Sequence, residues 1–145
     1  MSRMKQDENR QQQLIHDAIT RSTESVQDVA VQLWHSLALQ LVSIIGEGGF
    51  NSLYARSLYL AHKSYPWFPP DDASRQIDFQ FTDLKLSLAT QSPVDADKAS
   101  RMLLQTFANL LTSLVGGPLT ITILSSAWAN RISEQETASK ELRHE

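Results

Sequence analysis

Apolar residues recur at steps of three and four positions over most of the chain, which is the spacing of one face of an α-helix. The longest such run consists of Val26, Val29, Ala30, Leu33, Trp34, Leu37, Leu41, Ile44 and Ile45. Ser25, with Asp28 three residues later, has the spacing of a helix N-cap, so we expect this helix to begin there. Apolar residues widen to almost the whole circumference towards its end, which is typical of a helix at the centre of a fold.

The same spacing predicts further helices. One is indicated by Leu14, Ile15, Ala18 and Ile19, and others by residues 50–61, by residues 95–115 and by the residues from 119 onward. Pro66, Pro69 and Pro70 follow the helix at residues 50–61 and, because proline lacks a backbone N–H, are expected to end it in a stiff loop. The apolar pattern therefore predicts an all-α fold, a compact bundle of about five or six helices.

Residues 75–91 fit two patterns. Between residues 77 and 88 apolar and polar residues alternate as in two strands, with a turn at Thr82-Asp83. The helical alternative places Ile77, Phe81, Leu84 and Leu88 on one face. Because Thr-Asp is a poor substitute for the Asn-Gly or Asp-Gly of a two-residue hairpin turn, we predict a helix here.

Two parts of the chain resemble each other. The residues Val42-Ser43-Ile44-Ile45-Gly46 align with Thr112-Ser113-Leu114-Val115-Gly116, and after a one-residue gap Phe50 aligns with Leu119, Leu53 with Thr122, Ser57 with Ser126 and Tyr59 with Trp128. Glycine accepts a positive φ at the end of a helix, so we expect turns at Gly46, Gly49, Gly116 and Gly117. This predicts two pseudo-repeated helix–glycine turn–helix hairpins, although unrelated hairpins with glycine turns also look alike.

The organisation of the 145 residues is that of one domain. We expect a flexible, polar N-terminal segment over residues 1–13, a single helical domain over residues 14–132 and a charged tail over residues 133–145. The net charge of −3 disfavours binding to nucleic acid, which needs an excess of Lys and Arg. The absence of cysteine fits a cytoplasmic protein, because no disulfide framework is present in the sequence.

The segment from Met102 to Asn130 carries no charged residue and is long enough to cross a bilayer. It is broken in the middle by Gly116-Gly117-Pro118, and each half is too short to span. We therefore expect two core helices here rather than insertion into a membrane.

Candidate chemistry in the sequence is sparse. The four histidines are His16, His35, His62 and His144, and none has the i,i+3 or i,i+4 spacing to a second ligand that a metal site needs. No base, nucleophile and orienting group can be recognised together, so we expect no enzyme, no metal and no cofactor. The free amides near Gly49 could hold an anion, but a turn between two helices needs no ligand.

Several residues have the composition of a protein interface. Arg56 and Tyr59 share a helical face, as Arg and Tyr do in binding hot spots. Tyr65, Trp67 and Phe68 lie in the proline-rich loop, where they form either a lid on the bundle or a recognition surface, and Trp128 completes the set of predicted partner contacts.

The function that we expect from the sequence is non-enzymatic: a protein-protein interaction module that acts as an adaptor, regulatory or effector subunit. Its partner would be another protein or a second copy, as a homodimer through the faces around Leu119 to Trp128 and Leu53 to Leu60. The alternative is a ligand-sensing bundle that holds a small apolar molecule between its hairpins, in a cavity lined by Trp34, Phe107 and Trp128.

Overall fold

The protein is described by a computed structural model that covers residues 2–20 and 24–129, and the predicted tail at residues 133–145 lies outside this range. Every regular element in the described residues is a helix: α1 (Ser2–Thr20), α2 (Val26–Ala61), α3 (Ile77–Ala89), α4 (Pro93–Val115) and a last helix over residues 117–129. The predicted all-α bundle is therefore confirmed. The predicted N-cap of α2 is also confirmed, because the Ser25 side chain accepts a hydrogen bond from the Asp28 N–H.

Two single glycines make the sharp corners of the chain. Gly46, with φ 80° and ψ 167°, bends α2 into a first arm (residues 26–45) and a second arm (residues 47–61). Gly116 separates α4 from the last helix with φ 91° and ψ 159°. These dihedrals lie in a region that only glycine occupies readily, so the predicted positive φ at both residues is confirmed.

Both corners are shorter than the sequence indicated, because Gly49 and Gly117 already belong to the following helices. A Cβ at Gly49 would lie 3.2 Å from the Cβ of Ile45, and a Cβ at Gly117 would overlap the carboxylate of Asp7. These two glycines therefore allow close packing rather than an unusual backbone.

Residues 77–89 form the predicted helix, and the hairpin alternative is wrong. The buried residues of α3 are Gln80, Phe81, Leu84 and Leu88. Gln80 donates from Nε2 to the Asn51 Oδ1 of α2 at 3.0 Å, and Lys85 pairs with Asp28 at 2.9 Å. Both contacts hold α3 against α2. They join residues far apart in the chain and support the helix in addition to its own apolar periodicity.

The helix α1 begins well before residue 14, the start that the apolar pattern indicates. Its N-terminal half meets α4 through polar side chains: Gln11 is buried and donates from Nε2 to the Thr112 Oγ1 at 2.8 Å. Such a contact leaves no apolar periodicity in the sequence, which is why the pattern starts only at Leu14.

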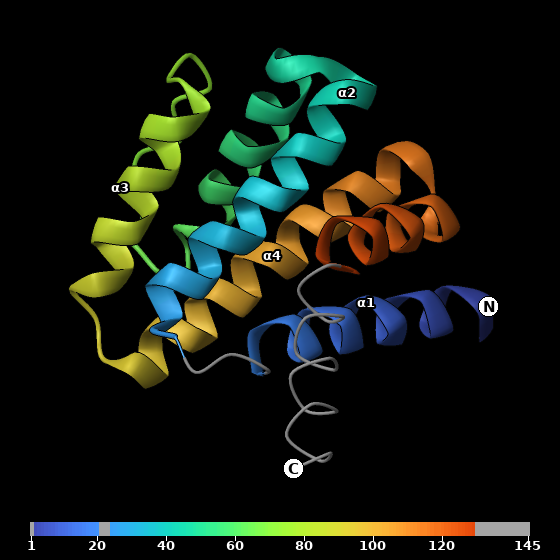
Figure 1. Cartoon of the computed structure of the whole chain (residues 1–145), viewed down its shortest axis with the longest axis horizontal. Coiled ribbons are helices and arrows are strands. Elements are labelled where there is room, and N and C mark those ends of the chain that lie inside the picture. Colours follow the sequence, from blue (N-terminus) through green and yellow to red (C-terminus); the bar gives the residue numbers. More distant parts are fainter. Residues whose placement is uncertain (1, 21–23, 130–145) are drawn as a thin grey trace, which may run out of the picture.

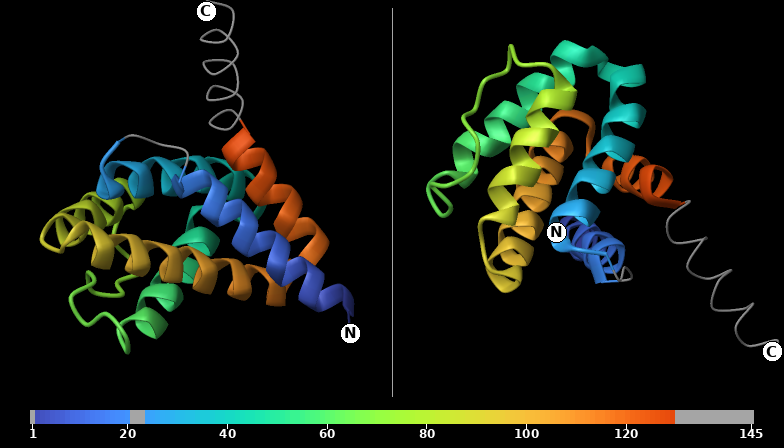
Figure 2. Two further views of the ribbon diagram at one scale, coloured as in Figure 1. Left: turned by 90° about the horizontal axis from the view of Figure 1, so that it is seen from below. Right: turned by 60° about the vertical axis from the view of Figure 1, so that its left-hand side comes forward.

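The first arm of α2 and the helix α4 lie side by side in the middle of the molecule (Figure 1). On one side α3 packs mainly on α2, and on the other α1 packs mainly on α4 beside the last helix (Figure 2). Five aromatic rings form the centre of the core, where α2, α3 and α4 meet: Trp34, Phe50, Tyr54, Phe81 and Phe107.

Among the described helices, α2 is long and apolar enough to cross a membrane by length and composition alone. Its buried residues line the protein core, and Gly46 bends it near its middle. A central helix of a folded bundle passes the same test of length and composition.

Candidate functional site

Arg56 and Tyr59 are exposed on the second arm of α2. The Arg56 guanidinium lies over the Tyr59 ring at 5.3 Å from its centre, and the Tyr59 side chain is 51% exposed. A cation over an aromatic ring at an exposed site is a weak attraction, of about 0.5–1 kcal/mol, that favours this arrangement of the two side chains.

The proline-rich loop folds back onto the bundle. Phe68 is only 4% exposed, and Tyr65 and Trp67 are half-buried against the core. The Nε2 of His62 lies 3.1 Å from the carbonyl oxygen of Phe68 and 2.8 Å from that of Pro69, so this nitrogen carries the proton and donates. The arrangement is that of a lid, and Phe68 offers no surface to a partner in this structure.

Trp128 is 1% exposed and donates from its indole Nε1 to the carbonyl oxygen of Leu33 at 3.2 Å. It therefore attaches the last helix to α2 instead of facing a partner. Trp34 and Phe107 contact each other with ring centres 5.1 Å apart. The aromatic side chains expected to line a ligand cavity thus pack against protein.

Tyr54 is fully buried, and its hydroxyl has no hydrogen-bond partner among the described residues. Burial raises the pKa of Tyr54 far above its usual range, and the negative charge of Asp83 raises it further. The phenol therefore stays protonated in the folded protein.

Replacing Tyr54 by Phe is expected to leave the free energy of unfolding unchanged or to raise it by up to about 1 kcal/mol, because an unpaired buried hydroxyl costs free energy. The raised pKa also has a consequence for pH. The unfolded chain loses the phenolic proton near the ordinary pKa of 10.0 while the folded protein keeps it, so stability falls as the pH rises above that value.

Urea denaturation at neutral pH and above pH 10.0 measures both effects. Tyr54→Phe should lose less stability at alkaline pH than the wild-type protein. A variant with a clearly lower stability at neutral pH would mean that the hydroxyl has a partner.

The carboxyl groups with shifted pKa values are placed for structural roles. Lys85 and the Ser25 hydroxyl hold the pKa of Asp28 below its usual range, and hydrogen bonds from Ser74 do the same for Asp72. A general acid needs the opposite shift. Within residues 2–20 and 24–129, no group of three His, Asp or Glu side chains could hold a metal ion.

Three of the surface clefts on the described residues are candidate binding sites. The Arg101 groove, of about 620 Å³, runs between α1 and α4 and is lined mostly by polar side chains. Arg101 is hydrogen-bonded there to Asp97 at 2.9 Å and to His16 at 3.1 Å. The Asp7 cleft, of about 480 Å³, lies where α1 meets the Gly116 corner. The Leu39 cleft, of about 570 Å³, lies between the first arm of α2 and the start of α3.

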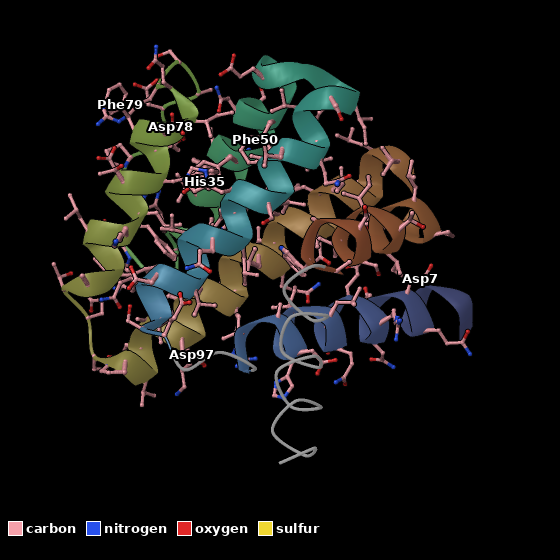
Figure 3. All side chains as sticks on the ribbon, in the orientation of Figure 1. Asp7, His35, Phe50, Asp78, Phe79 and Asp97 are labelled. Carbon is pink, nitrogen blue, oxygen red and sulfur yellow. The ribbon has the colours of Figure 1, made fainter. Side chains whose placement is uncertain are left out.

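The Leu39 cleft is the most apolar of the three. Its lining consists of His35, Ala38, Leu39, Val42, Ser43, Glu47, Gln76, Ile77 and Asp78. Leu39 is 78% exposed, and the His35 ring lies 4.9 Å from the Phe81 ring at the wall of the cleft. Figure 3 places His35 on the side of α2 that faces α3, with Asp78 at the start of α3.

No protein-family model, curated protein or solved structure matches the chain.

Sequence reasoning missed the Leu39 cleft. Leu39 belongs to the stretch that is apolar on nearly every side, where the pattern alone cannot distinguish a core position from a surface one. The sequence contains one indication of this cleft: the apolar face of this stretch is wider than the surface that the core can bury.

Proposed function

We propose that this protein acts by binding another protein, or a second copy of itself, as a non-enzymatic adaptor, regulatory or effector subunit. The observation that carries the proposal is a set of large apolar side chains on the described surface that are 44–78% exposed: Leu39, Ile44, Tyr59, Phe79, Leu86, Val94, Leu114 and Leu119. Large exposed apolar side chains mark a protein interface where they lie together on one face. A cytoplasmic location without nucleic-acid binding or membrane insertion belongs to the same proposal and rests on the sequence.

The faces proposed for a homodimer are partly exposed and partly buried. Leu119 is 44% exposed and Tyr59 is 51% exposed, while Leu58, Leu124 and Trp128 are buried in the core. A twofold contact would therefore use the outer edges of these helices, with Tyr59 and Leu119 as its apolar residues.

Sedimentation equilibrium at micromolar concentration and affinity capture from cells of the native host test the proposed function. We expect either a homodimer or one protein captured at a stoichiometric level. Replacing Tyr59 and Leu119 together by Ser is the matched variant, which should dissociate the dimer without loss of helix. A monomer that retains no protein would contradict the proposal.

We also propose that the chain contains an internal duplication, in which the unit is three helices rather than a hairpin. Gly46 and Gly116 are 70 residues apart and have nearly the same dihedrals. At this separation α1 corresponds to α3, the first arm of α2 to α4, and its second arm to the last helix.

Burial supports the separation of 70 residues. The pairs that are buried in both copies are Gln11 and Phe81, Leu14 and Leu84, Ala18 and Leu88, Val29 and Ala99, Ala30 and Ser100, Leu33 and Leu103, Trp34 and Leu104, Leu37 and Phe107, Ala38 and Ala108, Leu41 and Leu111, Phe50 and Thr120, Tyr54 and Leu124, and Leu58 and Trp128. The gap expected from the sequence would instead pair exposed Tyr59 with buried Trp128. The register without a gap is therefore the better one, although buried Ile15 and Ile19 correspond to exposed Lys85 and Ala89.

The lining residues of the Leu39 cleft and the Asp7 cleft are related by the same separation in sequence. Six lining positions of the Leu39 cleft correspond to six of the Asp7 cleft: Leu39 to Asn109, Val42 to Thr112, Ser43 to Ser113, Glu47 to Gly117, Ile77 to Asp7 and Asp78 to Glu8. The duplication thus gives two equivalent clefts whose chemistry differs.

A further inference from the structure

The two equivalent clefts differ in polarity but not in exposure. Leu39 and Asn109 are both exposed, and Val42 and Thr112 are both half-buried. The bundle therefore accommodates polar side chains at these positions, and its packing does not require the apolar ones. Leu39, which is 78% exposed, lies in one cleft with the half-buried Val42 and Ile77, and together they give the cleft an apolar surface that a partner can bind.

We propose that the Leu39 cleft binds an amphipathic helical segment of a partner protein, with a Leu or Ile side chain against Leu39 and Val42 and a Lys or Arg beside Glu47 and Asp78. This inference rests on the proposed function of the protein as an interaction module. A helix laid into an apolar groove is a recurring mode of peptide recognition.

The charge of the cleft selects a basic partner. Two carboxylates line it, Glu47 and Asp78, and no Lys or Arg is among its lining residues. Arg75, just before α3, pairs with Asp83 at 2.6 Å, and Lys85 of α3 pairs with Asp28 as described above. A cationic segment therefore finds a complementary field at this cleft.

Polar side chains that line the Asp7 cleft contact other parts of the chain. The Asp7 carboxylate lies against Gly117, in the space that a side chain at that residue would need, and Gln11 bonds to Thr112 across the cleft floor. Its polar groups are thus used inside the molecule, which makes the Asp7 cleft a built-in comparison for the open Leu39 cleft.

A synthetic amphipathic peptide of Leu and Lys, titrated into the isotopically labelled full-length protein and followed by NMR, tests the proposal. We expect chemical-shift changes at the Leu39 cleft and not at the Asp7 cleft. Leu39→Asn introduces the residue of the equivalent position and should weaken binding about tenfold, because a buried Leu side chain is removed from the contact. Leu114→Asn changes a residue that is 68% exposed but outside the cleft, and should leave the affinity unchanged.

The electrostatic part has its own test. Glu47→Gln combined with Asp78→Asn should weaken binding of the Leu-Lys peptide and reduce its dependence on salt, and a Leu-Glu peptide of the same length should bind less tightly than the Leu-Lys peptide. Equal affinities for the two peptides, equal effects of Leu39→Asn and Leu114→Asn, or shift changes elsewhere would overturn the inference. If host-cell capture still yields a partner that Leu39→Asn retains, the proposed function stands and this cleft is not its site.

Discussion

Trp128→Ala is expected to lower the free energy of unfolding by about 3–5 kcal/mol, the range for removing a buried aromatic side chain. Trp128 is fully enclosed and forms a hydrogen bond from the last helix to Leu33 in the first arm of α2. The substitution leaves a cavity at the contact that holds the last helix, so local fraying of residues 117–129 should accompany the loss. Urea denaturation monitored by circular dichroism measures the change.

Trp128→Phe is the matched control. It keeps an aromatic ring in the same space but removes the indole N–H, so we expect a smaller loss of about 1–2 kcal/mol from the hydrogen bond and the reduced volume. If Trp128→Ala costs less than the Phe variant, the last helix does not pack on α2 through this residue.

Gly46→Ala and Gly116→Ala are each expected to cost about 1–3 kcal/mol, because both glycines have dihedrals that disfavour any residue with a Cβ. No atom outside the adjoining residues lies within 4 Å of a Cβ built at either position, so backbone strain produces the loss. Similar losses at both corners would also agree with the proposed duplication.

Gly48→Ala separates this strain from the general effect of adding a methyl group. Gly48 is exposed and helical, with nothing within 4 Å of an added Cβ, and alanine there should stabilise the protein by about 0.5–1 kcal/mol. Thermal unfolding of the three variants under one condition measures the contrast. Equal melting temperatures for Gly46→Ala and Gly48→Ala would refute the role of the corner.

The sequence predicted the helices and both glycine corners, because apolar periodicity and the special dihedrals of glycine are local properties. The helix at residues 77–89 was also predictable, since its apolar residues keep a helical step and its centre lacks hairpin residues. The N-terminal extension of α1 could not be predicted, because the contact between Gln11 and Thr112 joins residues far apart in the chain through polar groups.

The candidate site was predicted less well than the fold. Trp128 and Phe68 have the composition of partner contacts, yet both are buried, because the side that a helix or loop turns inward depends on what packs against it. The Leu39 cleft becomes visible only once α2 and α3 lie together, since its lining residues come from both helices.

Because each glycine corner is a single residue, an insertion or deletion there changes the rotation of the helix that follows. Each added residue rotates the helix that follows by about 100°. An insertion after Gly46 would thus turn Phe50 and Tyr54 away from the aromatic core, and a deletion would turn them the other way. Natural variants of this protein should therefore differ in length along residues 62–76, between the end of α2 and the start of α3, and keep both glycine corners at one residue.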